Sequence, residues 1–172
     1  TLLCINNSLT AQKTIELKEK FDKVIVSPHI EVVFKKGDKA SIKIEEISVP
    51  IEKFNYELEK GTLQVYLEGA KTFTKNKKVV IRNQERKVPL YKNRVATLII
   101  TYTDVAIFSL RGEEKITFNS PLIQDKCELR IYGKSEVTIP TIDVNKLYVS
   151  IYGDSFLNIE KGIIEKQKIT AY

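Results

Sequence analysis

Apolar and polar residues alternate through the second half of the chain in a pattern that returns about every 20 residues. Residues 108–118, 129–139 and 149–159 align around a central glycine, and a fourth copy begins at Ile169. In each complete copy, apolar residues stand four and two positions before the glycine and four and six positions after it. Alternation with a period of two is typical of a strand with one buried face, so each copy is predicted to be strand, turn and strand.

The turn glycines are Gly112, Gly133 and Gly153, which lie 21 and then 20 residues apart. A corner between two strands often needs a positive φ, which glycine adopts without a Cβ clash. A third apolar pair follows each copy, as at Leu122 and Ile123, which predicts three short strands per repeat. Such a repeat leaves no room for a helix and favours coils that stack with their apolar positions inward, as in a parallel β-helix of about 20 residues per coil.

The first half alternates less regularly and predicts a β-rich part without a strict repeat. From Phe21 the pattern indicates a strand, a Ser-Pro-His corner, a strand, a Gly-Asp turn and a strand. Further strands are expected at residues 53–58, 62–68, 78–82 and 96–101. Residues 14–20 favour a single helical turn. No linker separates the halves, so residues 12–172 are predicted to form one domain.

Residues 1–11 are interpreted as the tail of a truncated signal peptide, with cleavage before Gln12. The alternatives are a lipoprotein signal with Cys4 as the lipidated residue, a disordered terminus, or a first strand. The chain contains no methionine, which indicates that it does not start at an initiator, and it stops within a repeat, so we expect truncation at both ends. No stretch reaches the roughly 18 apolar residues of a membrane span.

The formal net charge is +6, and basic residues gather near residues 75–94, which we interpret as an insertion. These residues are Lys75, Lys77, Lys78, Arg82, Arg86, Lys87, Lys92 and Arg94. They indicate either a patch for a nucleic acid or another polyanion, or an edge hairpin whose lysines discourage strand pairing. No nucleic-acid-binding motif accompanies them, so the second interpretation is favoured and no nucleic-acid partner is predicted.

Candidate catalytic chemistry is sparse in this sequence. His29 is the single histidine and is expected to be an exposed or locally bonded turn residue, and Cys127 stands in an inward column where it is expected to be buried. Four carboxylates near the predicted corners could converge into a polysaccharide-cleaving site: Glu113, Glu114, Glu136 and Asp154. They are mixed with lysines and share no column, so they are better explained as solubilising groups. We therefore predict no catalytic residue, no metal site and no cofactor.

The residues immediately before the glycines form the candidate binding site. They are Arg111, Tyr132 and Tyr152, and Tyr172 holds the same position in the fourth copy. Coils stacked about 4.8 Å apart would turn this column into an outward ladder. An aromatic ladder can bind sugars or extended chains, and the alternative is stacking that merely covers the outer face.

Residues 21–45, residues 95–112 and the glycine repeats resemble the auto-transporter adhesin head GIN domain family, which is common in secreted and envelope proteins of Bacteroidetes. The resemblance covers about residues 21–172. It implies a right-handed β-helix exported to the periplasm, the outer membrane or the cell surface, and it brings no catalytic residues. The chain departs from the family pattern in its basic stretch at residues 75–94, in Pro28 and His29 at a corner usually rich in small residues, and in its shortened repeats.

These observations predict a non-enzymatic, exported cell-envelope or surface module that binds a glycan or an envelope protein in the manner of an adhesin. The alternatives are a polysaccharide-active β-helix enzyme and a regulatory partner of an envelope signalling system.

Overall fold

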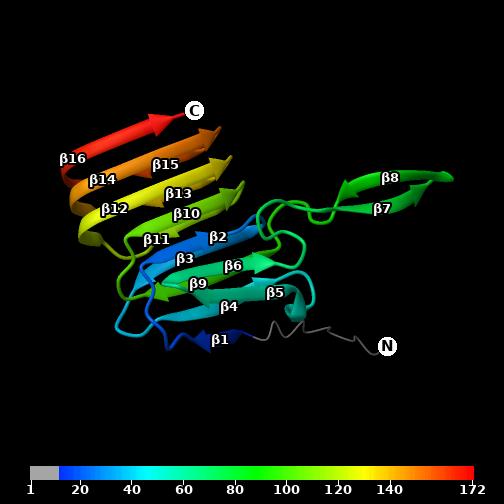
Figure 1. Cartoon of the computed structure of the whole chain (residues 1–172), viewed down its shortest axis with the longest axis horizontal. Coiled ribbons are helices and arrows are strands. Elements are labelled where there is room, and N and C mark those ends of the chain that lie inside the picture. The colour runs from blue at the N-terminus through cyan, green and yellow to red at the C-terminus, as the bar shows by residue number, and fades with distance from the viewer. Residues whose placement is uncertain (1–11) are drawn as a thin grey trace, which may run out of the picture.

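The computed structural model describes residues 12–172, and the interpretations of residues 1–11 lie outside this range. The fold is all-β, with two mixed sheets of seven strands each and one separate two-stranded sheet (Figure 1). In spatial order, the first sheet contains β1 (Lys13–Glu16), β4 (Ser41–Ile47), β9 (Ala96–Tyr102), β3 (Ile30–Lys36), β11 (Lys115–Phe118), β13 (Glu136–Ile139) and β15 (Phe156–Ile159). The second contains β16 (Gly162–Ala171), β14 (Ile142–Gly153), β12 (Leu122–Gly133), β10 (Ile107–Gly112), β2 (Lys23–Val26), β6 (Thr62–Leu67) and β5 (Phe54–Glu59). A 3-10 helix, η1 (Ile51–Lys53), precedes β5.

The glycine repeats stack in parallel and in register. Gly112 pairs with Gly133 in β10 and β12, and Gly133 pairs with Gly153 in β12 and β14. The short strands β11, β13 and β15 pair in the same way in the opposite sheet. A shift by one residue would turn every apolar side chain outward, which is why the hydrophobic pattern specifies this register.

Parallel stacking continues into the first half of the chain. β2 lies parallel to both β10 and β6, and β3 lies parallel to both β11 and β9. β6 and β9 therefore form a coil beside the coil of β2 and β3, although the arm described below separates them in sequence. The antiparallel strands β1, β4 and β5 complete that end of the molecule and make both sheets mixed.

Two local predictions were wrong. The expected helical turn at residues 14–20 is absent: residues 14–16 belong to β1, in which Ile15 pairs with Ile42 of β4, and residues 17–20 are irregular. The third apolar segment of each repeat is not a separate strand, because it continues into the first strand of the next copy and gives strands of 12 residues in β12 and β14. Within β12, consecutive exposed residues at Asp125 and Lys126 interrupt the alternation, and Ile123 is 57% exposed rather than inward. The strands expected at 53–58, 62–68, 78–82 and 96–101 all overlap observed strands.

Aromatic side chains fill the core between the two sheets near the centre of the stack. Phe34 packs at 5.0 Å against Phe108 and against Phe118, and at 6.2 Å against Tyr102, measured between ring centroids. All four side chains are almost fully buried. Cys127 is also fully buried, as predicted.

The basic stretch forms the separate two-stranded sheet, which projects away from the two large sheets (Figure 1). Its antiparallel strands are β7 (Asn76–Ile81) and β8 (Gln84–Pro89). Arg82 and Asn83 join them with φ values of +50° and +58°, as a two-residue hairpin turn of type I′ requires. We call residues 75–94 the arm.

Candidate binding cleft

A short corner joins the second sheet to the first in most of the coils. Gly112 and Glu114 stand at this corner between β10 and β11, and Pro28 and His29 stand at it between β2 and β3. In the coil of β6 and β9, the same corner is occupied by residues 68–95, which include the arm. This segment therefore emerges beside the turns of the neighbouring coils and forms a wall next to them.

A cleft of about 600 Å³ lies between this wall and the turns. Its wall on the side of the arm consists of Thr72, Phe73, Thr74 and Asn93. The remaining lining comes from the corners and from the strands that lead into them: Pro28, His29, Arg111, Gly112, Glu113, Glu114, Tyr132 and Gly133. Phe73 is 71% exposed, so the cleft has an apolar surface that no other part of residues 12–172 covers.

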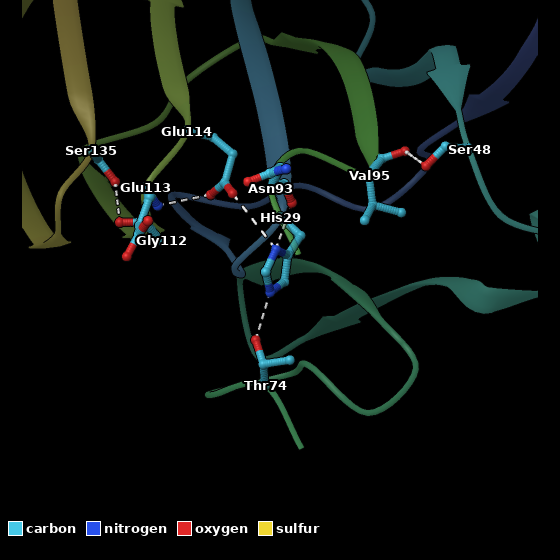
Figure 2. Close-up of polar contacts among 9 residues, drawn as sticks. All are labelled: His29, Ser48, Thr74, Asn93, Val95, Gly112, Glu113, Glu114 and Ser135. Carbon is cyan, nitrogen blue, oxygen red and sulfur yellow. Dashed lines mark hydrogen bonds and ion pairs between the residues drawn. The ribbon is translucent and has the colours of Figure 1, made fainter. Parts of the chain in front are cut away.

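His29 connects the corner side of the cleft to the wall on the side of the arm through two hydrogen bonds (Figure 2). Its Nδ1 lies 2.7 Å from the carbonyl oxygen of Asn93 and its Nε2 lies 2.6 Å from the Thr74 hydroxyl. Because a carbonyl only accepts, Nδ1 is the donor there, and Nε2 can then accept the hydrogen of Thr74. The side chain is 14% exposed, and the backbone has a φ of +71°, which is uncommon for a residue other than glycine.

Glu114 turns back over the glycine corner beside His29. Its carboxylate accepts a hydrogen bond of 2.9 Å from the backbone N–H of Glu113, and its other oxygen lies 3.8 Å from His29 Nδ1. The residue is 8% exposed. A Cβ on Gly112 would overlap with the same carboxylate, so the absent side chain at this glycine leaves room for Glu114.

The four carboxylates of the enzyme hypothesis are not gathered at one point. Glu113 and Glu114 line the cleft, whereas Glu136 and Asp154 do not. Glu136 is exposed and lies 3.8 Å from the amino group of Lys115. Among residues 12–172, no group of three His, Cys, Asp or Glu side chains is placed to hold a metal ion.

The column before the glycines forms a continuous stack. The rings of Tyr132 and Tyr152 lie 4.8 Å apart at an angle of 6°, and those of Tyr152 and Tyr172 lie 4.8 Å apart at 3°. The guanidinium of Arg111 stands 5.6 Å from the centre of the Tyr132 ring. We call these four residues the ladder. Since Arg111 and Tyr132 also line the cleft, the ladder starts there and runs along the stack away from it. Its role in binding stays a prediction.

The three corner glycines have positive φ values of +130°, +93° and +96° in chain order. A Cβ on Gly133 would overlap with the carbonyl oxygen of Gly112, and one on Gly153 would lie 2.6 Å from that of Gly133. The buried hydroxyl of Ser135 donates to the Gly112 carbonyl oxygen at 3.1 Å (Figure 2). These close approaches hold the corner backbone in place directly after the ladder residues.

The sequence alone does not predict the wall of the cleft on the side of the arm. Phe73, Thr74 and Asn93 belong to no repeat, and the sequence around His29 indicates only a turn. The available signal is the combination of Pro28-His29 at an unusual corner with an insertion of basic residues. Recognising that both lie at the same corner requires knowing that β6 stacks beside β2.

Residues 20–172 match the family described as "Putative auto-transporter adhesin, head GIN domain". The chain belongs to this family. None of the curated proteins matches it. Residues 12–172 include no helix with the length and apolar character needed to cross a membrane.

Several solved structures share the fold. A "putative lipid binding protein" from Parabacteroides distasonis is 16% identical with a TM-score of 0.66, over 93% of this chain and 62% of that one. A "putative adhesin" from the same species is also 16% identical, with a TM-score of 0.57, over 93% of this chain and 68% of that one. A "putative adhesin" from Bacteroides fragilis is 10% identical with a TM-score of 0.50, over 95% of this chain and 98% of that one. The chain thus spans about three fifths of the first protein, and at these identities the likeness shows the fold alone.

Proposed function

We propose that this chain is a non-enzymatic, exported module of the cell envelope or surface that binds a glycan chain in the cleft and along the ladder. Membership in a family named for adhesins supports a surface binding role. The coils are further proposed to form a right-handed parallel β-helix, which would present the ladder as one straight row.

The observation that carries the proposal is the continuity of the cleft with the ladder at Arg111 and Tyr132. The exposed ring of Phe73 offers a free face on which a sugar ring can stack, while Arg111 and Thr74 lie beside it as polar groups. Open clefts with an apolar surface and a few polar groups are typical ligand sites.

The ladder suits an extended polymer better than a single sugar. Its rings stack face to face, so the faces between them are occupied by their neighbours, while Tyr152 and Tyr172 remain 38% and 74% exposed. Repeated hydroxyl groups at the 4.8 Å spacing of the coils can each donate and accept hydrogen bonds. A glycan with regularly spaced hydroxyl groups is the matching ligand.

The test is a glycan array, followed by calorimetry with the best ligand. Phe73→Ala should weaken binding about two- to tenfold, since stacking on a ring contributes about 0.5–1.5 kcal/mol. The double variant Tyr132→Ser/Tyr152→Ser should also weaken it. Tyr148→Ser is the matched control, because Tyr148 and Tyr152 are both 38% exposed on the same strand and Tyr148 lies outside the ladder.

Unchanged affinity in both the Phe73 and the ladder variants would contradict the proposal. New reducing or unsaturated ends released from the bound glycan would instead favour the polysaccharide-active enzyme.

A further inference from the structure

We propose that the arm docks this protein onto an anionic lipid surface, with the exposed Val80 and Ile81 beside its turn entering the interface and its basic side chains contacting the headgroups. Only Asn93, at the base of the arm, also lines the cleft, and the proposal does not depend on glycan binding there.

The charge of the chain is concentrated in the arm. Residues 75–94 carry eight basic residues and one acidic residue, Glu85, for a net charge of +7. The whole chain has a net charge of +6, so the remainder is nearly neutral at −1. All eight basic side chains are exposed. Within the arm, Lys78 is paired with Glu85 at 3.1 Å, and Arg94 at its base contacts Glu46 at 3.0 Å.

Apolar side chains are interleaved with these charges toward the tip. Val80 is 70% exposed and Ile81 is 45% exposed, directly before the turn residue Arg82. Cross-strand pairing places Lys77 opposite Val88 and Val79 opposite Arg86, so both strands mix basic and apolar positions. Apolar residues flanked by cations are what the boundary between headgroups and acyl chains accommodates.

The arm is held so that its tip stands clear of the body (Figure 1). At its base, the Tyr91 hydroxyl donates to the Glu68 carbonyl oxygen at 2.9 Å, and Tyr91 is 9% exposed. The Lys75 N–H donates to the Gly69 carbonyl oxygen at 2.8 Å, and His29 holds Thr74. A fixed base with a projecting tip allows contact with a surface without moving the coils.

The exposed apolar side chains of Val80 and Ile81 favour lipid over other polyanions. A nucleic acid or an acidic polysaccharide would use the basic groups and leave Val80 and Ile81 in water. Binding of single-stranded nucleic acid also relies on exposed aromatic rings, and the arm's one aromatic residue, Tyr91, is buried at the base.

The first experiment measures sedimentation with vesicles of phosphatidylglycerol and phosphatidylcholine, and with phosphatidylcholine alone. The protein should bind the anionic vesicles, and added salt should weaken that binding. Lys77→Glu/Arg86→Glu should reduce partitioning about tenfold or more, and Val80→Ser/Ile81→Ser about tenfold. Lys161→Glu/Lys166→Glu is the control, because it changes charge by the same amount on exposed residues outside the arm and should have little effect.

The second experiment uses the fact that the chain contains no tryptophan. Val80→Trp places a single reporter at the tip, whose emission should shift to the blue with anionic vesicles and be quenched by brominated acyl chains. Phe156→Trp, at a position that is 62% exposed in β15, should show neither change.

Failure to bind anionic vesicles would overturn the proposal. A second contradicting result would be vesicle binding that the apolar double variant leaves unchanged, together with no blue shift in the emission of the Val80→Trp variant. If the protein then also bound heparin or RNA as well as it binds the anionic vesicles, the arm would be a general polyanion site.

Discussion

The ring of Tyr132 lies parallel to the ring of Tyr152, with 4.8 Å between their centroids and 6° between their planes. The two residues are register partners in β12 and β14, so the stack follows directly from the pairing of Gly133 with Gly153 one residue later. Tyr172 extends it by another 4.8 Å. The ladder therefore contributes to stability as well as providing a candidate binding surface.

Tyr152→Ser should destabilise the protein more than Tyr148→Ser. Tyr152 stacks on a ring at each side, and such aromatic pairs contribute about 0.5–1.5 kcal/mol each beyond the area they bury. Tyr148 has the same exposure and contacts the amino group of Lys126 at 5.1 Å instead. We expect an additional loss of about 1–2 kcal/mol in urea unfolding. Equal losses would mean that the ladder adds no stability.

Gly133→Ala should cost considerably more than Gly61→Ala. Both glycines have positive φ, of +93° and +74°, so both substitutions introduce backbone strain. At Gly133 the new Cβ would also overlap with the fixed backbone of Gly112, whereas at Gly61 it meets only the Asp22 side chain at 3.2 Å. We expect a loss of about 3 kcal/mol or more at Gly133 and about 1 kcal/mol at Gly61. Thermal unfolding of the two variants gives the comparison, and similar melting temperatures would refute it.

His29→Asn should loosen the base of the arm while retaining a residue that tolerates positive φ. The substitution removes the ring that contacts Thr74 and Asn93. Hydrogen exchange should rise at residues 72–75 and 92–94 and stay unchanged in β12 and β14. Thr74→Val removes the hydroxyl partner alone and should produce a smaller change in the same segment. Uniform exchange across the protein would indicate a global effect instead.

Alkaline pH should destabilise the protein through two buried groups. Burial raises the pKa of the Cys127 thiol from an ordinary 9.0 to about 12, and burial raises the pKa of the Tyr102 phenol from 10.0 to about 12. Both groups keep their protons in the folded state at pH values where the unfolded chain releases them. Their stabilising contribution is therefore complete below pH 9 and falls between pH 9 and 12, by about 1.4 kcal/mol per pH unit for each titrating group.

Urea unfolding between about pH 8 and 11 measures this slope. Cys127→Ala should lower stability at every pH through the small cavity it leaves, and should also make the slope less steep above pH 9. An unchanged slope in this variant would show that the thiol does not titrate on unfolding.

The repeats can be aligned from the sequence because each copy carries the same local signals. A glycine with apolar residues at fixed offsets determines both the register and the identity of the outward column, so the amino-acid sequence alone places Arg111, Tyr132, Tyr152 and Tyr172 together. The length of β12 cannot be read from the sequence in the same way. The alternation of apolar and polar residues breaks at Asp125 and Lys126, where two consecutive side chains are exposed, but the strand itself continues through them.

The cleft cannot be predicted from the sequence because its parts are joined only by tertiary stacking. His29 and Thr74 are 45 residues apart in sequence, and they meet because β6 lies beside β2. Nothing in the alternation of either strand specifies that neighbour. The charge pattern distinguishes the basic stretch from the rest of the chain, but its place at the corner of the coil follows only from the pairing of β9 with β3.

The position of β2 and β3 in the middle of both sheets constrains how the chain folds. Lys23 of β2 pairs with Thr62 on one side and with Ile107 on the other, so this coil gains its second neighbour only from a segment more than 80 residues later. Contacts of such long range form slowly because closing a long loop costs conformational entropy before the contact contributes any stability. We therefore expect residues up to 118 to fold as one cooperative unit, onto which β12 to β16 add as neighbouring coils. During synthesis from the N-terminus, β2 and β3 therefore each lack one of their two pairing partners until the middle of the chain, which contains β10 and β11, has been made.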